Sequence, residues 1–202
     1  MELEDKFLVS LIKYTKALSV ALGYRDIHTQ LHSERVQRLS LEIGGYCGLS
    51  KKEINVLNIA ASFHDIGKIG IPDHILFKPS QFNEAEWEKM KKHSEIGEKI
   101  IASTELEGSQ YASLVIRHHH EYYNGMGYPD KLSGESIPIC SRIISIADSY
   151  DAMAVTRPYH HARSHLKIMP ILDEETGEKF DPELMRVFCK IIESSKFIAP
   201  KM

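Results

Sequence analysis

The stretch SFHDIGKIGIPD, Ser62–Asp73, lies where an apolar helical pattern gives way to a turn that contains glycine. Ser50 with Glu53 three residues later is the spacing of a capping box, which opens this helix. Apolar residues at helical intervals lead to His64, and Asp65 follows it directly. An isolated histidine–aspartate pair at a helix end can simply complement the helix dipole and face solvent. Beside a glycine the two side chains can instead converge on metal ions, and the rest of the chain decides between these interpretations.

The rest of the chain predicts an all-α fold. Four further segments carry apolar residues at helical spacing: 7–22, 29–45, 111–118 and 139–153. We expect the first of them to end at Gly23. Asn83 begins a second capping-box spacing, and its helix is expected to run on to His93. Asp181–Pro182 begins a last helix. Alternating strand patterns, repeats and low-complexity linkers are not found, which favours one domain.

The composition excludes several classes of function. The chain has 202 residues, of which 43% are hydrophobic, and a net charge of −3. A nucleic-acid-binding module or membrane-surface protein is therefore disfavoured, because no basic stripe is present. The amino terminus is acidic, unlike a signal peptide, and no apolar run is long enough to span a membrane, so we expect a cytoplasmic protein. Cys47, Cys140 and Cys189 are widely spaced, which is typical of buried thiols in a reducing compartment.

The histidines are the unusual feature, because the chain has eleven of them. Several stand at helix ends or on apolar faces together with an aspartate: His28, His32, His64, His93, His119, His120 and Asp148. A charge on an apolar helix face is costly without a partner, and metal binding supplies one. Nitrogen and carboxylate ligands without thiolate suit iron, manganese, zinc, cobalt or nickel. The set suffices for two ions, the usual arrangement for hydrolysing phosphate esters.

Eight segments in chain order resemble the motifs of the bacterial HD-GYP family, a branch of the metal-dependent HD phosphohydrolases. They are HDIGKIGIPDHIL (64–76), KP (78–79), HSEIG (93–97), HHEYYNGMGYP (119–129), GESIP (134–138), RIISIADSYDAM (142–153), RPY (157–159) and FDPEL (180–184). The resemblance spans about residues 25–188. It implies an all-α, HD-type helical bundle with the HD-GYP extension. It also implies hydrolysis of cyclic di-GMP to linear pGpG, or on to GMP, in bacterial second-messenger signalling.

The same resemblance implies roles for individual residues. Seven would be metal ligands: His32, His64, Asp65, His93, His119, His120 and Asp148. Asp65 would bridge two divalent ions, with iron or manganese expected first and zinc, nickel or cobalt as alternatives. Lys68 would be a catalytic cation beside the phosphate. Tyr128, Asp151 and Arg157 would contact substrate with it, and His118 would be structural.

Two positions depart from the family pattern. Members with three metals carry a glutamate four residues before the first ligand histidine, and this chain has His28 there. We therefore expect two metals and a linear product, with His28 either an extra ligand or a bystander. Asn124 replaces the usual aspartate before the first loop glycine, and we expect little effect because asparagine adopts the same turns.

Alternatives to this function remain open at this point. The substrate is alternatively another cyclic dinucleotide such as cyclic GMP–AMP, a nucleotide monoester or a pyrophosphate. A non-catalytic cyclic di-GMP receptor is the alternative from a different class. We expect residues 24–202 to form the catalytic domain and residues 1–23 an N-terminal helix. That helix is a stub of the linker from a receiver or sensory domain, a homodimer contact, or one more core helix.

Overall fold

The computed structural model describes residues 17–105, 108–155 and 162–200, and these ranges confirm the all-α prediction. The elements are α2 (Ile27–Tyr46), α3 (Lys51–Phe63), η1 (Ile66–Gly70), α4 (Asp73–Leu76), α5 (Glu84–Lys91), α6 (His93–Ala102), α7 (Ser109–Arg117), η2 (Gly134–Ser136), α8 (Ile139–Ala154), α9 (His165–Glu174) and α10 (Pro182–Ile192). Within the described ranges the β-structure is one isolated bridge, between Thr176 and Phe180. No described helix is long and apolar enough to cross a membrane.

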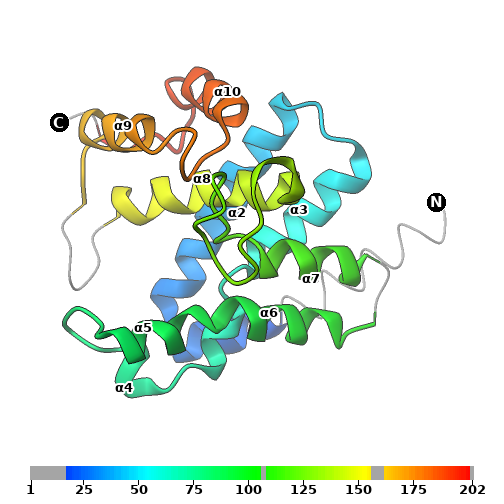
Figure 1. The fold of residues 1–202 in the computed structure, drawn as a ribbon, viewed down its shortest axis with the longest axis vertical. Helices are drawn as coiled ribbons and strands as arrows, with labels where there is room; N and C mark the ends of the chain where they lie inside the picture. Colours follow the sequence, from blue (N-terminus) through cyan, green and yellow to red (C-terminus); the bar gives the residue numbers. More distant parts are fainter. Residues whose placement is uncertain (1–16, 106–107, 156–161, 201–202) are drawn as a thin grey trace.

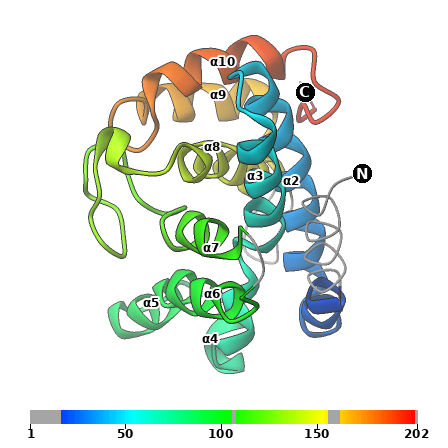
Figure 2. The same ribbon diagram turned by 90° about the vertical axis from the view of Figure 1, so that its right-hand side faces the viewer.

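The helices stack in layers along the long axis of the molecule. Both views show α8 between the α9–α10 pair and α7, with α6, α5 and α4 following beyond α7 (Figures 1 and 2). α2 packs against α3 and α8, and α6 packs against α7 and η1. The main core lies between these elements and includes fully buried Ile43, Leu57, Ile116 and Ile143. The packing brings the end of α3 beside α2 and close to the end of α7, since the ring of His64 lies 5.4 Å from that of His32 and 5.3 Å from that of His119.

Local capping explains several helix starts. The capping boxes of Ser50 with Glu53 and of Asn83 with Glu86 are both formed, as the spacing predicted. Each satisfies backbone N–H groups that the first turn leaves without partners. Asp181 caps α10, and Pro182 takes its first position.

Two predicted helix boundaries were wrong. Residues 17–25 are helical, so Gly23 does not end the first helix, and Asp26 instead caps α2. The pattern at 29–45 matches α2 to within two residues at each end. The helix from Asn83 ends at Lys91, and His93 begins a new helix, α6.

The predicted N-terminal helix lies partly outside the described residues, which begin at residue 17. In the described part, Leu22 is buried in the main core and Leu18 packs against it.

Candidate metal centre

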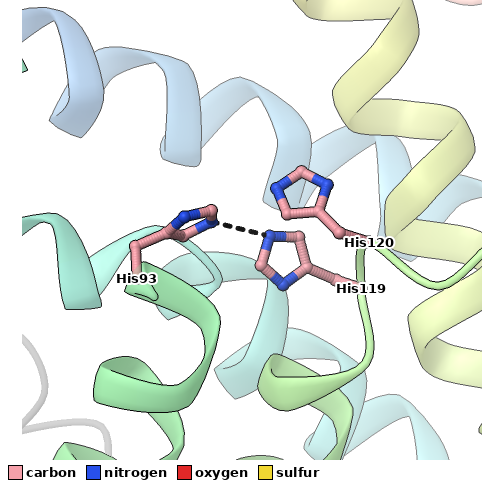
Figure 3. Close-up of side chains that lie close together, drawn as sticks. All are labelled: His93, His119 and His120. Carbon is pink, nitrogen blue, oxygen red and sulfur yellow. Dashed lines mark hydrogen bonds between the residues drawn. The ribbon is translucent and has the colours of Figure 1, made fainter. Parts of the chain in front are cut away.

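Two groups of buried ligand atoms lie at the meeting point of α2, α3, α6, α7 and α8. One group contains His32, His64 and Asp148, and the other contains His93, His119 and His120. Within each group the candidate ligand atoms lie within 4.8 Å of one another. Figure 3 shows the second group, in which three rings from two segments of the chain point toward one another. The six residues of these groups were all predicted from the sequence.

Helix ends deliver most of these side chains. His64 is the residue at which α3 ends, and Asp65 directly precedes η1. His93 begins α6, and His119 and His120 follow the end of α7. At a helix end the backbone direction changes, so adjacent side chains are not held about 100° apart as they are within a helix. This is why His64 and Asp65, like His119 and His120, can reach the same site.

The orientation of three rings is set by backbone carbonyl groups just before them in the chain. Nδ1 of His64, His93 and His119 lies 2.8, 2.7 and 2.6 Å from the carbonyl oxygen three residues earlier. A carbonyl oxygen only accepts, so each Nδ1 carries the proton and donates it. Each Nε2 then presents a lone pair toward the centre, which is the state that binds a metal ion.

These lone pairs lack donors among the described residues. Nε2 of His64 is buried and has no hydrogen-bond partner there. Nε2 of His93 and Nε2 of His119 lie 3.4 Å apart (Figure 3), although each faces the other with a lone pair. Buried acceptors aimed at one another are unfavourable unless a cation lies between them. The residues therefore fit a metal ion.

Asp65 lies between the two groups. Its Oδ2 is 3.5 Å from Nε2 of His64 and 3.9 Å from Nε2 of His32, and its Oδ1 is 3.6 Å from Nε2 of His93. The side chain is almost completely buried. One carboxylate oxygen thus faces each group, the arrangement that a bridging ligand requires.

The electrostatics keep four of the histidines and Asp65 in the forms that bind metal. Burial lowers the pKa of His64, His93 and His120, and it lowers the pKa of His119 to about 3, so these imidazoles are neutral. Burial would raise the pKa of Asp65, but the charge of Lys68 holds it well below the usual range. A neutral histidine and an ionised carboxylate are the protonation states that coordinate metals.

Lys68 is the cation beside the centre. Its Nζ donates to Oδ2 of Asp65 at 2.6 Å, and its side chain is about one-fifth exposed. The short helix η1 brings it back to Asp65, since the two are three residues apart. The ammonium is therefore held at the centre and still reaches solvent.

Gly67 allows η1 to approach α6. A Cβ at this position would lie 1.8 Å from the carbonyl oxygen of His93 and 2.6 Å from the backbone nitrogen of Gly97. Only glycine permits this approach. The close approach is what brings His93 within reach of Asp65.

Comparison with known proteins places this architecture in a family. A family model described as "HD domain" matches residues 16–184. Over 165 residues the chain is 38% identical to the cyclic di-GMP phosphodiesterase response regulator RpfG of Xanthomonas campestris. The aligned residues cover 82% of this chain and 44% of that relative. The chain belongs to the HD domain family, in its HD-GYP branch. The resemblance noted in the sequence is thereby confirmed.

Two further comparisons concern substrate and fold. The HD-GYP chain is 35% identical over 170 residues to 3′3′-cGAMP-specific phosphodiesterase 2 of Vibrio cholerae, covering 84% of this chain and 33% of that relative. The solved structure of Bd1817, a HDG"Y"P protein from Bdellovibrio bacteriovorus, matches with a TM-score of 0.65 at 17% identity, over 94% of this chain and 67% of that one. That likeness shows a shared fold. The HD-GYP chain spans less than half the length of the two curated relatives, RpfG and 3′3′-cGAMP-specific phosphodiesterase 2.

Asp151 lies behind the centre and is largely buried. Its Oδ2 is 2.6 Å from Nδ1 of His32, and Arg35 donates to both of its oxygens at 2.7 and 2.9 Å. Burial would lower the pKa of His32, but its hydrogen bonds to Asp148 and Asp151 raise it. The geometry gives Asp151 a hydrogen bond to a predicted ligand, and its substrate contact stays a prediction. Arg35 was missed, because nothing local to α2 signals its partner on α8.

Tyr128 lies against the second group. Its ring centroid is 4.9 Å from that of His120, and burial raises the pKa of its phenol. Its backbone N–H donates to the carbonyl of His120. The neighbouring Gly127 admits this contact, since a Cβ there would lie 2.6 Å from the same oxygen.

A network of ion pairs holds the loop that carries Tyr128. Arg117 donates to both oxygens of Asp130 at 2.6 and 2.7 Å, and Nε2 of His118 lies 2.9 Å from the same carboxylate. Glu121 accepts the backbone N–H of Asp130 at 2.7 Å. The ligand atoms of His118, Glu121 and Asp130 also lie within 4.8 Å of one another, but Arg117 already neutralises the carboxylate of Asp130. His118 thus has the structural surroundings that were expected.

One predicted residue lies outside the ligand groups, and another lies outside the described residues. His28 is exposed, and among the described residues it belongs to none of the ligand groups. Arg157 lies outside the described residues, so its predicted substrate contact stays a prediction.

Proposed function

We propose that the chain is a metal-dependent phosphodiesterase that hydrolyses cyclic di-GMP to linear pGpG. The observation that carries the proposal is the position of Asp65 between two histidine-bearing groups, with Lys68 bonded to it. The proposal is also supported by the printed function of the relative from Xanthomonas campestris.

Two ions are proposed, one per ligand group, with Asp65 touching both. Iron or manganese is the first expectation, and zinc, nickel or cobalt are alternatives, because the donors are nitrogen and oxygen. When bound, such ions polarise a phosphate and lower the pKa of water. His28 is proposed to be a bystander, since it is exposed and lies outside both groups.

In the proposed reaction, the oxygen of a water molecule bonds to phosphorus as the bond from phosphorus to the 3′ oxygen breaks. The 3′ oxygen leaves and takes up a proton. Lys68 is proposed to stabilise the negative charge that builds on the phosphate oxygens, because its ammonium is held at the centre by Asp65 and its side chain is still partly exposed. Tyr128 is proposed to face the substrate from beside His120, and Arg157 to contact it as well.

A second substrate is supported by one of the comparisons. The relative from Vibrio cholerae is named as specific for 3′3′-cGAMP, at an identity close to that of the cyclic di-GMP relative. The two substrates differ in one purine base, so the metal groups do not distinguish them.

The domain organisation belongs to the same proposal. Residues 24–202 are proposed to be the catalytic domain, working in a longer protein beside a receiver or sensory domain. The RpfG relative is named as a response regulator, and this chain covers 44% of it. A homodimer through the N-terminal helix and a cytoplasmic location are proposed as well.

The test is elemental analysis of anaerobically purified protein together with chromatography of the products from cyclic di-GMP and 3′3′-cGAMP. We expect two metal ions per chain and pGpG from cyclic di-GMP. Replacing His64 and Asp65 by alanine should abolish turnover. Metal without product from either substrate would instead favour a receptor. Three metals with release of GMP would contradict the assignment of His28 as a bystander.

A further inference from the structure

A row of aromatic rings leads away from the candidate metal centre. Tyr128 contacts the ring of His120, and the ring of Trp87 meets Tyr128 edge-on at a centroid distance of 6.2 Å. Phe82 in turn stacks on Trp87 at 6.3 Å, with the ring planes only 19° apart. The row thus runs from a predicted metal ligand, His120, through Tyr128 to the indole of Trp87 and on to Phe82.

Trp87 is exposed where burial would be expected. It lies on α5, whose other residues are mostly charged, and 45% of its surface is accessible. Phe82 packs against a small core of Ile71, Ile75 and Met90, so one neighbour of the indole is fixed in place. A large aromatic surface left accessible beside a polar site is typical of binding sites.

Lys91 adds a cation to this surface. It lies one helical turn after Trp87, its Nζ is 5.7 Å from the centroid of Tyr128, and it pairs with Glu88 at 2.5 Å. Guanine presents two acceptors, O6 and N7, that a lysine ammonium can contact, whereas adenine has an amino group in place of O6.

We infer that Trp87, Tyr128 and Lys91 form a subsite for one purine base of the substrate. The inference rests on the proposed function, because a phosphate at the metal groups places its nucleoside outward along the ring row. The base stacks on the indole and meets the phenol edge-on, because the two rings are nearly perpendicular, and Lys91 contacts the acceptor edge of guanine. Stacking on aromatic side chains is a common means of holding an unpaired base.

The first arm of the test uses the only tryptophan of the chain as a probe. Wild-type, metal-loaded protein is mixed rapidly with cyclic di-GMP, and the fluorescence of Trp87 is followed before turnover. We expect a saturable change, with half-saturation at the concentration that half-saturates hydrolysis. A binding measurement by calorimetry that shows complex formation without any change of fluorescence would overturn the subsite.

The second arm separates binding from chemistry. Trp87→Ala should raise KM for cyclic di-GMP roughly tenfold to hundredfold, as the loss of one stacked base implies. It should leave kcat, and turnover of methyl p-nitrophenyl phosphate, within about twofold, because that small diester has no nucleobase. Trp87→Phe should restore most of the affinity. The matched control is Tyr46→Ala, which removes an exposed ring at the end of α2, about 20 Å from His32 along the helix.

The outcomes distinguish the subsite from the proposed function. An unchanged KM in Trp87→Ala, with both substrates still hydrolysed, would overturn the subsite and leave the phosphodiesterase intact. Hydrolysis of the small diester without hydrolysis of cyclic di-GMP would contradict the proposed substrate, and an unchanged fluorescence would then reject the subsite too. Lys91→Met should reduce the preference for cyclic di-GMP over cyclic di-AMP, measured as the ratio of their kcat/KM values. An unchanged ratio would show that Lys91 is not part of the subsite.

Discussion

Asp151 forms a hydrogen bond with Nδ1 of His32, the ring nitrogen that points away from the metal centre. Its Oδ2 lies 2.6 Å from Nδ1 of His32, whose Nε2 lies 2.9 Å from Asp148. Arg35 donates two hydrogen bonds to the same carboxylate. A carboxylate that binds the far nitrogen of a metal-binding histidine fixes the ring and strengthens it as a ligand.

Asp151→Asn should therefore weaken metal binding roughly tenfold to hundredfold. Activity should fall at limiting metal and recover in excess metal, which a metal titration of turnover would measure. Glu34→Gln, a neighbouring change on α2, is the control and should match the wild type. If Asp151 contacts substrate instead, its variant will keep its metal affinity and show a raised KM.

Lys68→Met should lower kcat by about a hundredfold, since it removes one charged donor from the centre. Lys68→Arg should recover part of the loss, because it keeps the charge. Metal content, measured by elemental analysis, should stay at the wild-type level in both variants. Loss of the metals in Lys68→Met would show that the lysine stabilises Asp65 rather than the reaction.

Gly67→Ala should disrupt the contact between η1 and α6, since its Cβ would meet the backbone of His93. We expect a loss of about 1–3 kcal/mol in the free energy of unfolding, and a loss of metal from the group that contains His93. Gly45→Ala is the matched control, because a Cβ there meets nothing within 4 Å and alanine favours a helix. Denaturant unfolding measures both, and equal stabilities would contradict the packing argument.

Metal removal should destabilise the protein, because it leaves the lone pairs of His64, His93 and His119 without a cation. A metal concentration of a hundred times Kd corresponds to about 2.7 kcal/mol. Chelation should therefore lower Tm by roughly 5–10 °C for a chain of this size. Chelation should lower the Tm of His28→Ala by the same amount as that of the wild type, and it should lower the Tm of His64→Ala by less. A smaller decrease of Tm on chelation of His28→Ala than of the wild type would show that His28 is a ligand.

The Arg117–Asp130 pair should keep the Tyr128 loop in place down to acid pH. Hydrogen bonds from Arg117 hold the pKa of Asp130 below its usual range. A lowered folded-state pKa adds stability above the unfolded value of about 3.9, and this stability is lost as the pH falls through the folded value. The side chain is 37% exposed, so the contribution should stay below about 1 kcal/mol.

Limited proteolysis of the loop should thus be constant from pH 7 to about pH 4 and increase below it. Asp130→Asn should raise the cleavage rate across this range and raise KM, with metal content unchanged. Glu98→Gln is the control, since it removes a partner of Arg117 and leaves the bonds to Asp130. An Asp130→Asn variant with wild-type cleavage would show that the pair does not hold the loop.

Local features of the chain were predictable because their causes lie within a few residues. The capping boxes at Ser50 and Asn83 depend on a glutamate three residues later, and both are formed. The first helix was predicted to end at Gly23, which instead lies within it. A single glycine costs about 1 kcal/mol in a helix, and the packing of Leu22 in the main core outweighs that cost.

The break at Lys92 shows the limit of sequence periodicity. Residues 84–102 continue in helical pattern, yet α5 ends and α6 begins there. The reason is tertiary: the ring of His93 bonds the carbonyl of Met90 and meets His119 across the centre. Such a contact cannot be inferred from the spacing of apolar residues.

By itself, the sequence determined the helical class, most of the helix starts and the residue types that can bind metal, since each depends on short-range spacing and side-chain chemistry. Only the tertiary structure decided that Asp151 orients His32 with the help of Arg35, and that Gly67 brings η1 against His93. Asp151 and His32 are 119 positions apart. Their pairing follows from how α8 packs on α2, because hydrogen bonds and close backbone contacts depend on distances that only the packed helices define.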